Sequence, residues 1–224
     1  MLAVVVGSGK LATELLERLE LPDGMTLQAW GDTEPAAGAA FVVHAGSGRQ
    51  LAQVIAYCER TGATLLELST GSALEQARPL FPVVLCPNTN ILMLKFMSML
   101  STSGHLFRGH DISLLESHQH DKTSAPGTAV ALAESLGLKP DAIASERDPS
   151  RQKDLLAVPR EHLARHAVHR IRISDGVCTV NLESRVMGEA PYARGVGQLL
   201  RALQTRTLEL RLYRVEELIN AGWL

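Results

Sequence analysis

The segment from Glu116 to Ala129 carries the densest set of residues able to do chemistry, and it reads Glu-Ser-His-Gln-His-Asp-Lys-Thr-Ser-Ala-Pro-Gly-Thr-Ala. It places His118, His120 and Lys122 on one polar loop. A histidine exchanges a proton near neutral pH, and a neighbouring ammonium group can stabilise a developing negative charge. The segment therefore predicts a site where a proton is transferred beside a cation.

A helix is predicted over 127–136, directly after this loop. Pro126 suits a helix start, and the first N–H groups of a helix have no partner inside it. Those at Gly127 and Thr128, with the Thr128 hydroxyl and the Lys122 ammonium, form a suitable carboxylate site. The alternative is a solvated polar loop that only caps the helix.

The N-terminal sequence contains a second candidate site, in Val4-Val-Val-Gly-Ser-Gly-Lys-Leu-Ala12. A strand, a glycine turn and a helical pattern follow one another here, which resembles the dinucleotide-binding fingerprint, with Ala12 in place of its third glycine. Asp32 follows the next predicted strand and is placed to bind an adenosine ribose, which favours NAD. Lys10 could approach a phosphate, which leaves NADP open. The alternatives are a glycine turn without a ligand and, for Asp32, a plain turn residue.

The first ninety residues alternate short apolar runs with helical patterns, which is typical of βαβ units on a parallel sheet. Strands are predicted over 2–6, 25–30, 41–44, 64–68 and 82–86, and helices over 13–19 and 50–60. Polar loops over 69–72 and 87–90 follow the last two strands. Open α/β sheets bind ligands at the carboxyl ends of their strands, so these loops are candidate ligand contacts.

The pattern changes after residue 90. Helices are predicted over 91–101, 127–136, 196–203 and 215–220, and a strand over 111–116. Two further strands, 168–174 and 177–185, flank Asp175-Gly176, which indicates a hairpin. The charged, proline-containing stretch 144–165 is predicted to be a connector with a short helix.

The overall composition excludes several classes of protein. The chain has 224 residues and a formal net charge of −2, so no electrostatic pattern predicts a nucleic-acid or anionic-membrane partner. Its three cysteines are widely spaced, which argues against a disulfide framework or a cysteine-rich zinc site and favours the cytoplasm. The apolar start ends after six residues, and the run 91–100 contains Lys95, so neither a signal peptide nor a transmembrane segment is predicted.

Three weaker candidates lie elsewhere. The H-x3-H-x2-H spacing of His162, His166 and His169 would suit a metal on a helix, but no acidic or cysteine ligand accompanies it, so no metal site is predicted. A solvated helix face or a subunit contact is the alternative. Arg185 could pair with a substrate carboxylate or be an exposed strand-end charge. The methionines over 93–99 are predicted to pack in the core.

The loop motif as a whole resembles the signature of the dihydrodipicolinate reductase family, E-x-H-H-x-x-K-x-D-A-P-S-G-T-A. Glu116, His118, Lys122 and the run 125–129 follow it in order. The resemblance extends over most of the chain. Residues 42–47 correspond to the family motif V-I-D-F-T/S, 68–71 to G-T-T-G and 87–90 to N-F-S. Near the end of the chain, 182–185 and 192–195 resemble the family motifs S-R and F-A-x-G-A.

The resemblance implies a Rossmann-type parallel sheet formed by 1–90 with 192–224. It also implies an inserted α+β domain over 91–191 that binds substrate and mediates oligomerisation, commonly as a tetramer. The implied activity is NAD(P)H-dependent reduction of a small cyclic imine dicarboxylate, most specifically dihydrodipicolinate to tetrahydrodipicolinate in lysine and diaminopimelate biosynthesis.

By the same resemblance, His118 is the acid/base group and Lys122 the proton donor and charge partner. Substrate contacts are implied for Gln119, His120, Gly127, Thr128 and Arg185. The implied cofactor contacts are Gly7, Ser8, Gly9, Lys10, Leu11, Asp32, His44, Ala45, Gly46, Ser69, Thr70, Gly71, Asn88 and Asn90.

The sequence departs from the family pattern in four places. Gln119 replaces the second histidine, Ser124 an aspartate and His44 the first loop aspartate, and the serine before Gly127 is missing. Two alternatives therefore stay open: a reductase of another small cyclic imine, and a catalytically silent NAD(P)-binding regulatory protein.

Overall fold

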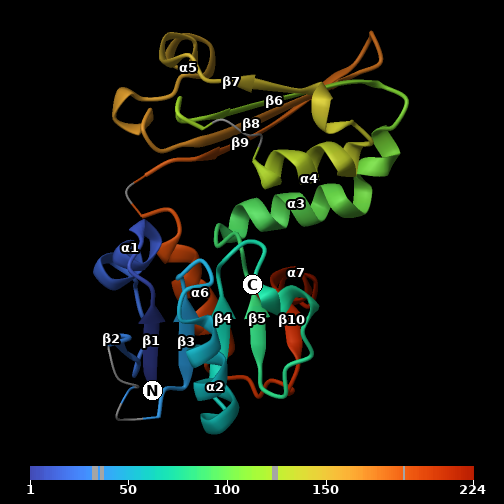
Figure 1. Cartoon of the computed structure of the whole chain (residues 1–224). Coiled ribbons are helices and arrows are strands. Elements are labelled where there is room, and N and C mark those ends of the chain that lie inside the picture. The colour runs from blue at the N-terminus through green and yellow to red at the C-terminus, as the bar shows by residue number, and fades with distance from the viewer. Residues whose placement is uncertain (32–34, 36–37, 123–125, 189) are drawn as a thin grey trace. The chain divides into compact units, whose positions relative to one another are not determined.

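The structure is a computed structural model, and it describes residues 1–31, 35, 38–122, 126–188 and 190–224. The chain divides into two compact units (Figure 1). Unit 1 comprises Met1–Leu94 and Tyr192–Leu224, and unit 2 comprises Lys95–Pro191. The first boundary falls inside helix α3 (Ile91–Ser103).

Unit 1 is built on a six-stranded sheet of order β10-β5-β4-β3-β1-β2, in which every pairing is parallel. Its strands are β1 (Leu2–Val6), β2 (Thr26–Ala29), β3 (Phe41–His44), β4 (Thr64–Glu67), β5 (Val83–Leu85) and β10 (Leu212–Arg214). The central strands are buried on both faces, because helices cover the sheet on each side. The predicted Rossmann-type sheet is thus confirmed.

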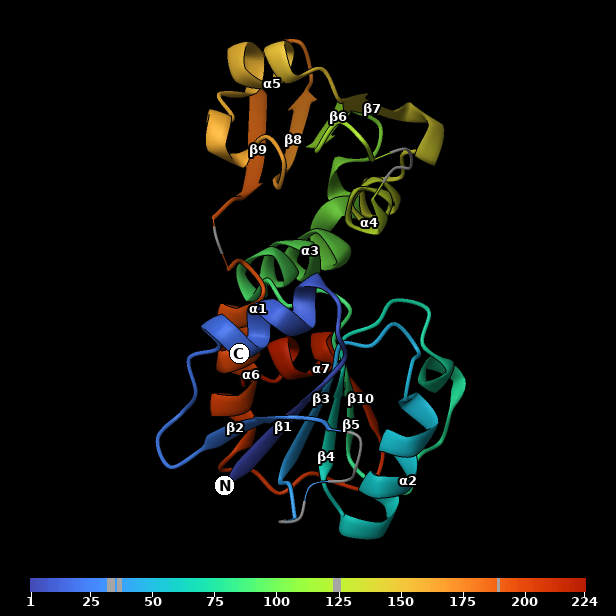
Figure 2. The same cartoon turned by 60° about the vertical axis from the view of Figure 1, so that its left-hand side comes forward.

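Helices cover the two faces because the chain leaves β1 and β3 in opposite directions across the sheet. The β1-to-β2 connection contains α1 (Lys10–Arg18), and the β3-to-β4 connection contains α2 (Leu51–Thr61). Right-handed crossovers in opposite directions place these helices on opposite faces. Figure 2 shows α2 on one face, with α1 and α6 (Ala193–Leu203) together on the other. Helix α7 (Val215–Asn220) follows β10.

Unit 2 contains a four-stranded mixed sheet of order β7-β6-β8-β9. Its strands are β6 (Asp111–His118), β7 (Ile143–Glu146), β8 (Ala167–Ser174) and β9 (Thr179–Val186). β7 pairs with β6 in parallel, whereas β8 runs antiparallel to both β6 and β9. This second sheet, with its helices, confirms the predicted α+β part of the fold.

The two faces of the unit 2 sheet carry different helices (Figure 1). Leu115 and Val168 pack with Leu156 of α5 (Pro149–Leu156) on one face. Helix α4 (Gly127–Leu136) packs against β6 and β7 on the other. The face covered by α4 therefore carries the alternate residues of β6, which include Leu114, Glu116 and His118.

The prediction for 144–165 was only partly right. The stretch contains the helix α5, but its start belongs to the strand β7, which forms an edge of the sheet. β7 has four residues, of which the central two are exposed, so it lacks the apolar alternation by which a strand is recognised. The edge strand β10 was missed for a similar reason, since it has only three residues.

Two further expectations concern membranes and cysteines. Within the described ranges, no helix combines the length and the apolar character that crossing a bilayer requires. All three cysteines are free: Cys58 and Cys86 are buried and Cys178 is exposed. Burial raises the pKa of the Cys58 thiol to about 12.

Candidate functional site

The predicted cofactor contacts of unit 1 gather at one edge of its sheet. They follow β1, β3, β4 and β5, which are adjacent and parallel, so their carboxyl ends share that edge. The parallel strand pattern alone predicts that these loops share one edge of the sheet, and their contact with a cofactor stays a prediction. Asp32 lies outside the described residues.

The turn after β1 has two glycines with different roles. Gly7 has φ +130°, and a Cβ there would lie 2.7 Å from the carbonyl oxygen of Ala45. Gly9 is the N-cap of α1, and a Cβ there would meet nothing within 4 Å. Gly7 is thus required by packing, whereas the space at Gly9 lies at a helix N-terminus, which favours anions. Ser8, Lys10 and Leu11 complete the turn, with Ser8 and Lys10 exposed.

The loop after β4 contains Ser69, Thr70 and Gly71. The Ser69 hydroxyl oxygen is buried, and it has no hydrogen-bond partner among the described residues. A buried polar atom without a partner is unfavourable, so it suits a site completed by a ligand or water. This atom and the open space at Gly9 fit a bound dinucleotide.

The loops after β3 and β5 hold side chains that bind other parts of unit 1. The His44 side chain is fully buried and both of its ring nitrogens are engaged, so it supports the Ala45–Gly46 segment from within. Asn88 accepts from the Asn90 N–H at 3.0 Å, and Asn90 accepts from the Met93 N–H at 3.0 Å. Asn90 thus caps the start of α3.

In unit 2, one row of polar side chains crosses all four strands on the face covered by α4. Cross-strand register aligns Ser145, Glu116, His169 and Ser184 from β7 to β9. The preceding row on the same face is apolar and consists of Ile143, Leu114, Ile171 and Leu182. The face changes from core to polar site where β6 ends at His118.

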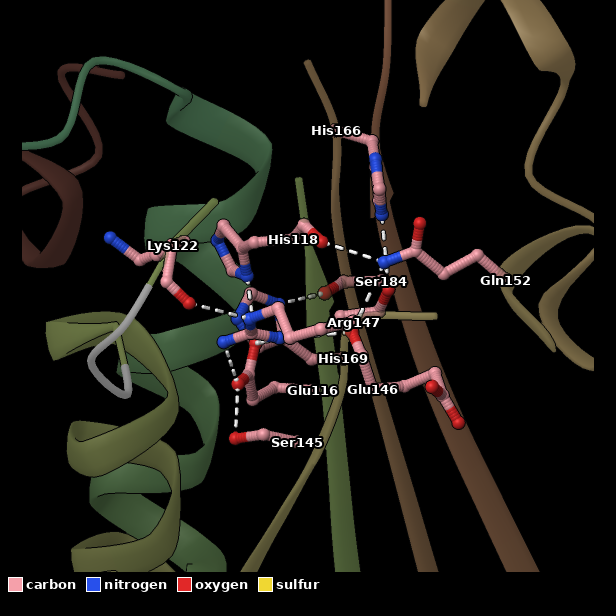
Figure 3. Close-up of polar contacts among 11 residues, drawn as sticks. Glu116, His118, Lys122, Ser145, Glu146, Arg147, Gln152, His166, His169 and Ser184 are labelled. Atoms are coloured by element: carbon pink, nitrogen blue, oxygen red, sulfur yellow. Dashed lines mark hydrogen bonds and ion pairs between the residues drawn. The ribbon is translucent and has the colours of Figure 1, made fainter. Parts of the chain in front are cut away.

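Glu116 is the centre of this polar row (Figure 3). Its carboxylate is fully buried, and it accepts hydrogen bonds from His118 Nδ1 at 2.8 Å, from the Ser145 hydroxyl at 2.5 Å and from the Arg147 guanidinium at 2.5 and 3.1 Å. Burial alone would raise the pKa of Glu116, but these hydrogen bonds outweigh it and lower the pKa to about 2. Glu116 is therefore an anion near neutral pH, and its carboxylate accepts a hydrogen bond from Nδ1 of His118.

Arg147 joins this centre to the loop after β6. Its Nε donates to the backbone carbonyl of Lys122 at 3.0 Å while its other nitrogens bind Glu116. In Figure 3, the Lys122 carbonyl turns toward Arg147 and the Lys122 side chain extends away from it. The fully buried Gln152 donates to the His118 carbonyl at 2.7 Å. The backbone at each end of the segment 118–122 is thus fixed by one side chain.

His169 lies beside His118, with ring centroids 5.8 Å apart. Its Nδ1 bonds the Ser184 hydroxyl at 3.1 Å, and its buried Nε2 has no partner in the part of the chain that the structure describes. Burial and the charge of His118 lower the pKa of His169 to about 4, against a smaller opposing effect of Glu116. His169 is therefore neutral near pH 7.

The predicted substrate contacts fall into two groups. Gln119, His120 and Lys122 follow β6 in a turn closed by the Lys122 N–H to the Gln119 carbonyl at 3.1 Å. Gly127 and Thr128 begin α4, with Pro126 as its N-cap. These residues therefore belong to the two described ends of one loop.

Arg185 is not brought to this loop. It follows Ser184 on β9, so its side chain points to the opposite face of the sheet from His169. There it pairs with Glu183 at 2.5 Å. Alternation along the strand thus argues against the predicted pairing of Arg185 with a substrate carboxylate beside His118 and favours the alternative, a charge at the end of the strand.

The three histidines considered for a metal do not share a helix. His166 Nε2 bonds the Ser117 hydroxyl at 3.0 Å, and its Nδ1 bonds the His162 carbonyl at 3.1 Å. His169 lies on β8. Within the residues that the structure describes, no group of three or more possible ligands is arranged around one point.

Sequence reasoning missed Arg147, Ser145, His169 and Gln152 as parts of the polar cluster. Arg147 and Ser145 depend on β7, which the sequence did not reveal. His169 could have been found, because alternation along a strand predicted over 168–174 puts it on the same face as the apolar Ile171 and Ile173. A histidine in such a series calls for a polar partner.

The comparisons with known proteins found both curated relatives and similar solved structures. No protein-family model matches the chain. The chain is 33% identical over 126 residues to 4-hydroxy-tetrahydrodipicolinate reductase 2, chloroplastic, of Arabidopsis thaliana, over 52% of this chain and 36% of that protein. It is 34% identical over 96 residues to the probable 4-hydroxy-tetrahydrodipicolinate reductase 2, chloroplastic, of Oryza sativa subsp. japonica, over 40% of this chain and 30% of that protein. The matches thus span about a third of the length of these curated relatives.

The fold gives a fuller match. It is similar to that of the dipicolinate-bound dihydrodipicolinate reductase from Paenisporosarcina sp. TG-14, with a TM-score of 0.64 at 15% identity. This similarity covers 97% of this chain and 99% of that chain. Both units of this chain therefore have counterparts in that fold.

Proposed function

Because the chain is a divergent relative of the dihydrodipicolinate reductases, we propose that it is an NAD(P)H-dependent reductase of a small cyclic imine dicarboxylate, most specifically dihydrodipicolinate. One observation carries the proposal: both ends of the segment 118–122 are held by one buried ion pair. The His118 side chain bonds the fully buried Glu116 carboxylate, and the Lys122 carbonyl accepts from Arg147, which pairs with Glu116. Such a buried ionic support is costly for an ordinary surface loop. It suits a segment whose side chains must be held for chemistry.

Unit 1 would hold the dinucleotide. The N-terminus of α1, at the open Gly9, would bind the pyrophosphate, and the loops after β3, β4 and β5 would line the rest of the site. The orphaned hydroxyl of Ser69 is a natural partner for the bound cofactor. The cofactor, when bound, supplies the hydride. An acidic residue at position 32 favours NADH, and Lys10 keeps NADPH possible.

Unit 2 would bind the cyclic imine substrate and supply a proton-transfer group. Glu116 accepts from His118 Nδ1, which would leave Nε2 as the nitrogen available to a ligand. The Lys122 ammonium would balance charge that develops on the ring nitrogen. Amide groups at Gly127 and Thr128 would bind a carboxylate at the start of α4.

The resemblance to the reductases leads us to propose an oligomer, most specifically a tetramer. The three free cysteines lead us to propose a reducing compartment such as the cytoplasm. The edge strand β9 is mostly exposed, with Val180 39% exposed, so it presents a surface that a second copy could cover. Size-exclusion chromatography with light scattering measures this directly. A monomer at assay concentration would exclude it.

A second candidate is favoured by the substitutions in the loop itself. Gln119 has an amide where the family has a second imidazole, and the missing serine before Gly127 removes a hydroxyl from the helix start. Both changes remove polar contacts of the pattern. A related cyclic imine with differently placed carboxylates is therefore the alternative substrate.

The test uses two stages on the whole chain. Titration of NADH and of NADPH, followed by nucleotide fluorescence, asks whether unit 1 binds either cofactor. Oxidation of each nucleotide with freshly generated dihydrodipicolinate, and its inhibition by pyridine-2,6-dicarboxylate, then ask about the substrate. Turnover that this dianion inhibits supports the proposal. Cofactor binding without turnover or dianion binding favours the other imine or a silent protein, and no cofactor binding excludes a reductase.

A further inference from the structure

A buried pair of ionisable side chains lies at matching positions on two neighbouring strands of unit 1. His44 ends β3 and Glu67 ends β4, and the two are direct partners in the parallel register. Both side chains are fully buried, and His44 Nδ1 lies 2.7 Å from Glu67 Oε2. The pair therefore sits beneath the edge where the nucleotide loops begin.

Each of the two side chains also contacts the loop that follows its own strand. His44 Nε2 lies 2.8 Å from the Arg49 carbonyl oxygen, and Glu67 Oε1 accepts from the Ser69 N–H at 2.8 Å. A carbonyl only accepts, so Nε2 must carry a hydrogen, and a single proton is shared between Nδ1 and the carboxylate. Burial would lower the pKa of His44, but the bonds to Glu67 and Arg49 outweigh it and raise the pKa.

The loop that His44 holds has a costly backbone conformation. Ser47 has φ +51°, Gly48 +85° and Gln50 +61°, so two non-glycine residues adopt the left-handed region. All three are exposed, so no buried side chain of their own holds them there. Such strain persists only where surrounding contacts determine it, and it is concentrated at ligand sites.

The His44 imidazole packs so closely against Gly46 that only glycine fits at position 46. A Cβ at Gly46 would lie 2.7 Å from His44 Nε2 and 2.7 Å from the Arg49 carbonyl oxygen. The neighbouring Ala45 carbonyl in turn packs on Gly7 of the turn after β1. The pair thus supports three of the loops at this edge, directly or through one contact.

We propose that His44 and Glu67 act as a hydrogen-bonded positioning pair that presets the dinucleotide-binding loops of unit 1. The inference rests on the proposed function, because it concerns binding of the nicotinamide dinucleotide. Neither residue contacts the cofactor in this role. They lower the cost of binding by holding the loop 45–50 and the start of the loop after β4 in one arrangement.

The experiment measures NADH and NADPH dissociation constants by fluorescence, beside the thermal unfolding temperature of each variant. Glu67→Ala removes both bonds and is expected to raise the dissociation constant about tenfold. Glu67→Gln can donate from its amide nitrogen to neutral His44 and accept from the Ser69 N–H, so it is expected to bind within about threefold of the unaltered protein.

Two further variants cover loss of folding and general destabilisation. His44→Asn keeps a hydrogen-bond donor for Glu67 but cannot reach the Arg49 carbonyl, so it frees the loop while Glu67 retains a partner. It is also expected to weaken binding about tenfold, and it decides the question if Glu67→Ala does not fold. Tyr57→Phe is the matched control, because it removes a buried bond to the Ala39 N–H at the opposite end of β3.

The outcomes separate this inference from the proposed function. Weak binding by Glu67→Ala and His44→Asn, with near-normal binding by Glu67→Gln and Tyr57→Phe, supports the positioning pair. Normal binding by His44→Asn overturns it, as does weak binding by Glu67→Gln or by Tyr57→Phe. If the unaltered protein binds neither nucleotide, the proposed function itself fails, and the inference fails with it.

Discussion

Arg147 binds Glu116 through its terminal nitrogens and the Lys122 carbonyl through Nε, so one guanidinium connects the end of β6 to the loop that follows it. The Glu116 side chain is fully buried and the Arg147 side chain is 20% exposed. A buried carboxylate needs a compensating partner, and here that partner also sets the position of the loop. The stability of the protein and the geometry of the site therefore both depend on Arg147. Different substitutions of this residue can separate the two effects.

Arg147→Met is expected to destabilise the protein by about 3 kcal/mol, because it leaves the Glu116 carboxylate buried without its cation. Arg147→Lys keeps the charge but loses the fork that reaches two partners at once, so turnover should fall at least about tenfold while the NADH dissociation constant is unchanged. Urea unfolding and steady-state kinetics measure the two effects.

The matched control for Arg147 is Arg151→Met. Arg151 is 65% exposed and pairs with Glu146 at 2.7 Å. Loss of an exposed pair should cost less than about 1 kcal/mol and leave turnover normal. Equal effects of the Arg147 and Arg151 substitutions would show that the buried contacts carry no special role.

Lys122→Ala is expected to lower turnover about a hundredfold, in the range for loss of a proton donor or charge partner. Cofactor binding should not change, since Lys122 belongs to unit 2. Lys153→Ala, an exposed lysine on α5, is the control. Normal turnover in a folded Lys122→Ala protein would end the proposed role of this side chain.

His118→Gln should reduce turnover strongly with little change in the affinity for NADH. The amide can still contact Glu116, but it cannot exchange a proton as an imidazole does. Measuring kcat and the NADH dissociation constant on the same preparation gives the comparison. A variant that loses affinity for NADH but keeps kcat would contradict the proposed acid/base role of His118 and would indicate a role in cofactor binding.

The sequence was most informative where local pattern decides structure. The strand, glycine turn and helix around Gly7 and Gly9, the loop after β6 and the start of α4 at Gly127 all depend on residues close together in the chain. The same holds for the β8–β9 hairpin, although its connection spans 175–178 and is thus longer than Asp175-Gly176.

The parts that the sequence did not predict depend on distant residues. Arg147 acts on Glu116 across 31 positions, through a strand too short and exposed to be recognised. Glu67 pairs with His44 only because β3 and β4 are neighbours in register. The position of Glu67 at the end of an apolar strand was a signal available in the sequence. Identifying His44 as its partner, however, required knowledge of the strand order.

His169 and Glu116 should each contribute to a loss of stability in acid, in different pH ranges. Folded His169 has a pKa near 4, whereas an unfolded histidine binds its proton near pH 6.5. As the pH falls from 6.5 to 4, the unfolded chain takes up a proton that the folded one refuses, so the free energy of unfolding falls by about 3 kcal/mol. Glu116, with a folded pKa of about 2 against 4.5 unfolded, adds a further loss between pH 4.5 and 2.

The histidine step can be isolated by substitution. Between pH 7 and 5, urea unfolding of His169→Asn should lose about 2 kcal/mol less than that of the unaltered protein, whatever its absolute stability. His105→Asn, at an exposed histidine, should show the unaltered slope. Identical slopes for all three proteins would mean that His169 is not held neutral in the fold.

Gly7 and Gly9 should respond in opposite ways to the same substitution. Gly7→Ala forces a Cβ against the Ala45 carbonyl at φ +130°, so it should destabilise the protein by at least about 2 kcal/mol. Gly9→Ala meets open space, so it should cost less than about 1 kcal/mol, the range for a poorer N-cap. Its added methyl would, however, occupy the space at the start of α1. If that space receives the pyrophosphate, Gly9→Ala lowers the affinity for NADH and NADPH in a protein of nearly normal stability, whereas normal affinity would mean that the cofactor lies elsewhere.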